Sequence, residues 1–131
     1  MNFPVMVKTT LILSGLIASG VGFGILFIPH TFHASAGIVL GDDINLLNEM
    51  RSSGGMVLVS GLLILMGAIR AKMTLYALLA STVLYLSYGL SRVVSLVSDG
   101  VPNNSMLQII ALELFIGALS ATMLKFFRKS N

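Results

Sequence analysis

The chain has 131 residues, of which 56% are hydrophobic and only 10% are charged. Soluble domains carry about 25% charged residues, so this composition excludes an ordinary soluble domain and indicates a protein of the lipid bilayer. The absence of cysteine excludes disulfides and thiol chemistry, and the net charge of +3 comes from residues at predicted helix ends rather than from a basic stripe that would bind nucleic acid.

Four apolar segments follow one another along the chain, at residues 9–28, 52–69, 73–91 and 106–124. Each is close to the ~20 residues that a membrane-spanning helix requires. We therefore predict an all-α fold, an integral membrane four-helix bundle, with helices at about residues 6–28, 44–69, 73–98 and 105–127. These helices use most of the chain, so residues 1–131 are expected to form a single domain. The first segment is longer than the ~7 to 15 apolar residues of a secretory signal core, and we expect it to be retained.

Lysine and arginine are distributed unevenly between the two sides of the membrane that these helices imply. One side carries Lys8, Arg70, Lys72, Lys125, Arg128 and Lys129, and the other carries Arg51 and Arg92. Because cytoplasmic loops are enriched in Lys and Arg, we predict that both termini are cytoplasmic. The acidic residues in or beside the loops all fall on the opposite, outer side: Asp42, Asp43, Glu49 and Asp99.

The outer segment at residues 29–51 is longer than the ~12 to 15 residues usual for a structureless loop in a compact domain. Asp42 or Asp43 is suited to cap a short helix that begins at Ile44 and leads directly into the second span. The segment then either anchors the second span at the membrane surface or forms a lid.

A metal site is one alternative for the outer side, because His30 and His33 fall on it together with Asp42, Asp43 and Asp99. Polar residues are expected at a membrane interface in any case, and this spacing matches no metal-binding motif. We therefore expect no metal and no other cofactor.

Small residues mark the first two spans. Gly15, Ser19 and Gly22 lie in the first, and Gly54-Gly55 begins the second, where Ser53, Ser60 and Gly67 follow at a spacing of seven. Such residues let helices approach closely, and a lone glycine pair lacks the other features of a nucleotide loop. We interpret these series as packing faces.

The third span carries one polar stripe, because Ser81, Tyr85, Tyr88, Arg92 and Ser95 follow at spacings of four, three, four and three. Hydroxyls and a guanidinium gain nothing from contact with lipid. The stripe is therefore predicted to face the bundle or a wet cavity.

Glu113 stands in the middle of the last apolar segment, where a carboxylate is costly without a partner. Counting 1.5 Å per residue places Arg92 ~9 Å and Glu113 ~12 Å below the outer ends of their helices, so the two can meet. We predict an ion pair with a bidentate contact, in which Tyr85 or Tyr88 also donates to the carboxylate. The pair either belongs to a binding site or only fixes the register of two helices, and in the alternative Arg92 reaches outward to lipid head groups or to Asp99. Ser105 and Gln108 match a capping box for the last helix.

Several short motifs occur in a characteristic order along the chain. These are Asn48-Glu49-x-Arg51-x-x-Gly54-Gly55, then Tyr88-Gly89-Leu90-Ser91-Arg92, Ser95, Asp99-Gly100-x-Pro102 and a late Glu113. Together they resemble the uncharacterised bacterial membrane family catalogued as domain of unknown function 4345, with Ser91 standing where a glycine is expected. The resemblance covers nearly the whole chain. It implies a bacterial four-helix membrane protein and assigns no activity.

The preferred functional hypothesis is a binding protein of the bacterial inner membrane with an outward-facing charged pocket for a small polar or amphiphilic, lipid-like ligand. The residues expected to form this pocket are Glu49, Arg51, Tyr85, Tyr88, Arg92, Asp99 and Glu113. One alternative is a proton- or ion-coupled transporter or channel acting as a homodimer or another oligomer. Another is a structural subunit of a larger membrane complex. An enzyme is the weakest hypothesis, because the sequence contains no nucleophile with an adjacent base and no cofactor motif.

Overall fold

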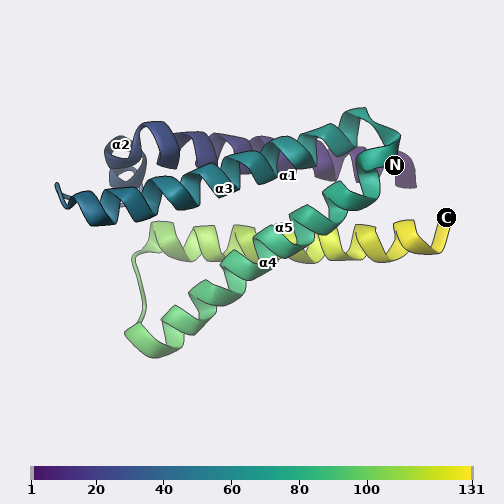
Figure 1. Cartoon of the computed structure of the whole chain (residues 1–131). Coiled ribbons are helices and arrows are strands. Elements are labelled where there is room, and N and C mark those ends of the chain that lie inside the picture. Colours follow the sequence, from purple (N-terminus) through teal and green to yellow (C-terminus); the bar gives the residue numbers. More distant parts are fainter. Residues whose placement is uncertain (1, 131) are drawn as a thin grey trace.

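The computed structural model describes residues 2–130, and every regular element within them is a helix (Figure 1). The elements are α1 (Phe3–Phe27), α2 (Pro29–Ala34), α3 (Ile44–Ile69), a 3-10 turn η1 (Ala71–Met73), α4 (Thr74–Asp99) and α5 (Asn104–Ser130). The four long helices, with η1 continuing into α4, are each long and apolar enough to cross a membrane. The predicted all-α fold with four spans is therefore confirmed.

Side-chain caps set where three of the long helices begin. Asn2 Oδ1 accepts a hydrogen bond from Val5 N (3.1 Å) at the start of α1. Asp43 Oδ1 accepts from Asn45 N (2.9 Å) at the start of α3, as one of the two predicted caps. The cap of α5 is Asn103, whose Oδ1 accepts from Met106 N (3.0 Å), so the predicted capping box at Ser105 is wrong.

The helices form two tight pairs, α1 with α3 and α4 with α5, and α4 crosses its partner obliquely (Figure 1). Glycines bring α1 and α3 together. A Cβ at Gly22 would collide with the backbone of Leu58, and one at Gly61 with the backbone of Ser19. The predicted close packing of these two helices therefore exists. On α3, however, the residues that contact α1 are Gly54 and Gly61, each one position after the predicted Ser53 and Ser60.

The second pair is joined by a buried polar contact and by two reciprocal close approaches. Ser81 Oγ of α4 lies 2.7 Å from Ser120 Oγ of α5, with both side chains fully buried. Gly89 of α4 packs against Leu114, and Gly117 of α5 packs against Leu86. The residues of the predicted polar stripe that lie in the inner half of α4 thus face the interior of the bundle.

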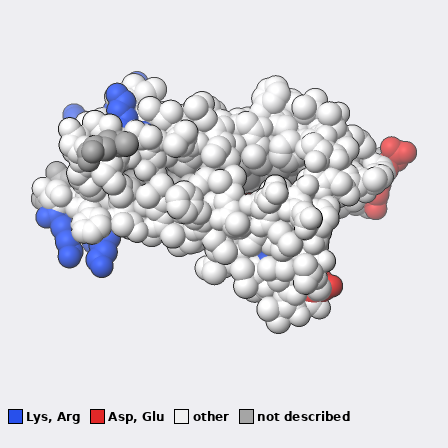
Figure 2. Space-filling model, turned by 180° about the vertical axis from the view of Figure 1, so that it is seen from behind, with Lys and Arg blue, Asp and Glu red and all other residues white. Residues whose placement is uncertain are grey.

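The two ends of the bundle differ in charge. Figure 2 shows Lys and Arg gathered at one end and Asp and Glu at the other. Both termini lie at the basic end (Figure 1). We call this the inner end, and we call the end that carries Asp42, Asp43 and Asp99 the outer end. That the termini are cytoplasmic stays a prediction.

Candidate functional site

An ion pair links α4 and α5 in their outer half. Arg92 Nε donates to Glu113 Oε2 at 2.8 Å, and the two side chains are 30% and 14% exposed, respectively. The depth argument therefore placed both groups correctly, and the alternative in which Arg92 reaches outward to Asp99 is wrong. Asp99 instead accepts a hydrogen bond from Ser95 Oγ, one helical turn away (2.8 Å).

The contacts around this pair differ from the prediction in two respects. The guanidinium uses Nε alone toward Glu113, so the contact is a single hydrogen bond rather than a bidentate one. Neither tyrosine donates to the carboxylate. The Tyr85 hydroxyl donates across the bundle to the backbone carbonyl of Ser14 on α1, and the Tyr88 ring lies beside Arg92, with its centroid 6.0 Å from Cζ.

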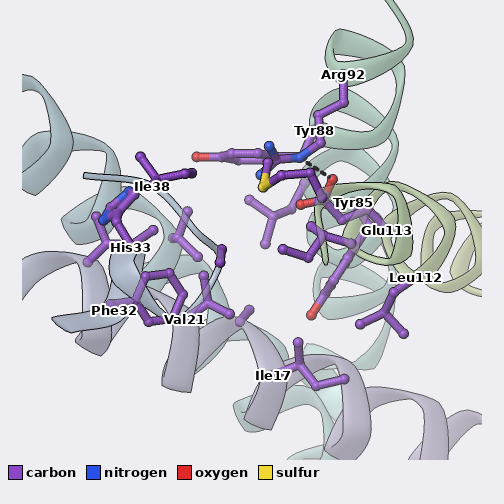
Figure 3. A pocket seen from close by; sticks show the side chains of 17 residues that line it. Ile17, Val21, Phe32, His33, Ile38, Tyr85, Tyr88, Arg92, Leu112 and Glu113 are labelled. Carbon is purple, nitrogen blue, oxygen red and sulfur yellow. Dashed lines mark hydrogen bonds and ion pairs between the residues drawn. The ribbon is translucent and has the colours of Figure 1, made fainter. Parts of the chain in front are cut away.

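Arg92 and Glu113 lie on the wall of a cavity of about 200 Å³. The cavity is bounded by α1, α2 and the following loop on one side and by α4 and α5 on the other. Figure 3 shows Arg92 and Tyr88 reaching into it from α4, opposite Phe32 and His33 of α2. Most other lining side chains are apolar, including Ile17, Val21 and Ile38. The space therefore combines a largely hydrocarbon wall with a few polar groups.

Below the cavity the bundle is closely packed. Tyr85 is only 5% exposed and forms part of the cavity lining next to its contact with Ser14. Leu11, Ile64 and Leu78 are completely buried in the core of the bundle. The cavity is thus confined to the outer half of the bundle.

Four of the seven sequence-predicted site residues line this cavity: Tyr85, Tyr88, Arg92 and Glu113. The other three lie elsewhere. Glu49 and Arg51 are exposed on α3, where Arg51 donates to the backbone carbonyl of Leu26. Asp99 lines a separate crevice of about 250 Å³ at the α4–α5 turn, of which Arg92 forms another wall.

Sequence reasoning singled out residues 29–51 as an anchor or a lid, but it did not identify the residues of this segment that cover the outer end of the cavity. Phe32 and His33 belong to α2, and Ile38 lies in residues 35–43, which we call the strap. Gly37 and Gly41 have φ values of 78° and 66°, which favour glycine, and they allow the strap to turn back over the helices. Pro29 and these two glycines were the available signals for this substructure.

Hydrogen bonds at both ends hold the strap in place. His30 Nε2 donates to the carbonyl of Gly41 (2.9 Å), and Asn103 Nδ2 donates to the carbonyl of Ala36 (3.0 Å). His33 Nδ1 donates to the carbonyl of Pro29 (2.8 Å). Within residues 2–130 the His, Asp and Glu side chains form no group of three that could hold a metal ion.

Comparison with known proteins identifies a family. The model of a family described as domain of unknown function 4345 matches residues 6–124, which is most of the chain. No curated protein and no solved structure matches the chain. The chain therefore belongs to the family described as domain of unknown function 4345, and its four long apolar helices make it a multi-pass membrane protein.

Proposed function

We propose that this protein binds an amphiphile with an anionic head group in the outer cavity. The observation that carries the proposal is the position of Arg92. Its Nε is occupied by Glu113, while its two terminal nitrogens have no hydrogen-bond partner among residues 2–130 and lie at the wall of the cavity. A guanidinium is suited to a carboxylate or a phosphate because its nitrogens present several donors in one plane.

The size of the cavity favours part of an amphiphile over a whole lipid. Its volume of about 200 Å³ exceeds the roughly 150 Å³ of an apolar cavity that binds benzene, but it is below the roughly 300–1,000 Å³ of pockets for drug-sized ligands. The space suits a short length of hydrocarbon chain next to a head group at Arg92. The remaining chain would extend into the bilayer.

The surface of the molecule supports access from the side. Figure 2 shows a hollow between the α1–α3 pair and the α4–α5 pair. A ligand that dissolves in the bilayer can approach such a hollow without first entering water. The ligand is therefore a membrane-soluble molecule rather than a free ion.

Binding fits the packing better than transport through a single chain does. A transport path would have to continue from the cavity to the inner end, where Leu11, Ile64 and Leu78 are completely buried.

The excess of Lys and Arg at the inner end favours that end as the cytoplasmic one. We therefore place the cavity at the periplasmic face of a bacterial inner membrane.

The direct test compares ligand retention by two matched variants. Val21→Phe adds a ring to the cavity wall, whereas Val83→Phe adds the same ring on the 57% exposed, lipid-facing side of α4. We expect native mass spectrometry to find an amphiphile on the wild type and on Val83→Phe, and to find at least tenfold less on Val21→Phe. Equal retention by the two variants contradicts the proposal.

The head group is tested with a fatty acid and the fatty alcohol of the same chain length. We expect lauric acid to raise the unfolding temperature of the wild type more than lauryl alcohol does. The double variant Arg92→Gln/Glu113→Gln, which removes both charges together, should lose this preference. Arg51→Gln, which removes a cation at the same end but outside the cavity, should keep it. A wild type that responds equally to the acid and the alcohol rules out an anionic head group.

A further inference from the structure

A second cavity lies at the inner end, far from the ion pair. It has a volume of about 430 Å³ and forms where the start of α1, the α3–α4 connection and the end of α5 meet. Its walls are mainly apolar, with Phe3, Val7, Leu11 and Ile69 among them. Lys8 is the charged residue of the described chain that lines it. We call this cavity the inner groove.

The cations around the inner groove have no acidic partner within the described chain. The salt bridge found within residues 2–130 joins Arg92 to Glu113 in the outer half. The remaining Asp and Glu side chains are those of Asp42, Asp43 and Glu49, just before or within the first turns of α3, and of Asp99 at the end of α4. Figure 2 shows the acidic residues away from the basic end of the bundle. Six cations at or near the inner end form no salt bridge with any residue from 2 to 130: Lys8, Arg70, Lys72, Lys125, Arg128 and Lys129.

Four of these cations are adjacent in sequence to residues that line the groove. Arg70 lies between Ile69 and Ala71, Lys72 follows Ala71, Arg128 follows Phe127, and Lys129 precedes Ser130. With Lys8 on the wall, positive charge therefore gathers around a mainly apolar groove at the inner end of the bundle. This combination is complementary to a molecule with an apolar chain and a negative head.

We propose that the inner groove binds one anionic phospholipid. An acyl chain lies against the apolar walls, and the phosphate lies beside the Lys8 ammonium. A free phosphate ion would leave those walls without a partner. A zwitterionic phospholipid would bring its own cation next to a groove whose described lining residues include no Asp or Glu. Net negative charge on the lipid is therefore favoured.

This proposal does not depend on the outer cavity, because the two cavities have no lining residue in common. A protein without an outer ligand can still hold a lipid at the inner groove. The two proposals can fail separately.

The test titrates purified protein in neutral detergent with phosphatidylglycerol, phosphatidylcholine or inorganic phosphate and follows binding by native mass spectrometry and thermal unfolding. Phosphatidylglycerol should bind at least tenfold more tightly than phosphatidylcholine. Inorganic phosphate should neither compete with it nor raise the unfolding temperature. Lys8→Gln should weaken phosphatidylglycerol about fivefold, as expected for one cation near an anionic head group.

Two controls separate the groove from general attraction to the basic end. Lys125→Gln removes one charge from the same end but outside the groove, and it should leave the affinity nearly unchanged. Ala71→Phe fills the groove from an exposed position and should abolish the preference for phosphatidylglycerol, whereas Ala111→Phe, exposed on α5, should not. Equal losses in Lys8→Gln and Lys125→Gln, competition by inorganic phosphate, or unchanged binding by Ala71→Phe would each overturn the proposal.

Discussion

At the scale of single residues, the Arg92–Glu113 pair is asymmetric. Glu113 is 14% exposed and Arg92 is 30% exposed, so the carboxylate depends more on its partner than the guanidinium does. Pairing compensates for the cost of removing both charges from water, and such a pair adds little net stability over an apolar replacement. Its main energetic consequence is that neither member can be removed alone without cost.

Arg92→Gln should therefore lower the free energy of unfolding by about 1–3 kcal/mol, less than the ~3–5 kcal/mol found when a fully buried pair is broken. Removing both charges in Arg92→Gln/Glu113→Gln should cost less than Arg92→Gln alone, because no unpaired carboxylate is left. Equilibrium unfolding in mixed micelles measures both values. A double variant that is less stable than the wild type by the sum of the losses in Arg92→Gln and in Glu113→Gln would show that the two groups act independently.

Residue-level prediction worked for this pair because helix geometry converts sequence position into depth. Arg92 and Glu113 were placed at similar depths on consecutive spans, and the structure joins them at 2.8 Å. The hydrogen-bond partners of the tyrosines were not predicted correctly. Tyr85 donates to the backbone carbonyl of Ser14, and a backbone acceptor has no signature in the sequence.

At the scale of elements, the strap and the start of α5 depend on the same residue. Asn103 uses Oδ1 to cap α5 and Nδ2 to hold the carbonyl of Ala36. The local sequence pattern predicted this cap two residues later, at Ser105. The hydrogen bond from Asn103 to the carbonyl of Ala36 favours Asn103 as the cap. It joins segments far apart in the chain, so the local sequence pattern could not predict it.

Asn103→Asp separates the two roles of this side chain. The carboxylate keeps the acceptor that caps α5 but loses the amide donor to Ala36. Hydrogen exchange should therefore become faster by about tenfold in the strap, at residues 35–43, while the first turn of α5 keeps its protection. Faster exchange in both segments would mean that the cap, rather than the contact with Ala36, was lost.

At the scale of the whole molecule, hydropathy predicted four membrane helices, and charge predicted that the acidic and basic residues lie at opposite ends. The pairing of α1 with α3 and the oblique crossing of α4 were not predicted. Periodicity indicates which face of a helix is buried but not the angle at which two helices cross, because that angle depends on how their side chains interdigitate. The outer cavity lies between helices of both pairs, and its apolar wall in α1 and α2 was not predicted either.

The predicted orientation has a direct test because the chain contains no cysteine. Val39 is 93% exposed in the strap, and Lys129 is exposed near the end of α5. In intact bacterial spheroplasts, a membrane-impermeant maleimide should label Val39→Cys and should label Lys129→Cys only after lysis. Labelling of Lys129→Cys alone before lysis would invert the topology and place the cavity at the cytoplasmic face.

The central claim is that the outer cavity holds an amphiphile whose head group contacts Arg92. A crystal structure of the protein grown from a lipid mesophase tests it most directly. We expect continuous density along Ile17 and Val21 that ends in a polar group within hydrogen-bonding distance of the terminal nitrogens of Arg92. An empty or collapsed cavity at high resolution, with Arg92 contacting only Glu113, would contradict the account.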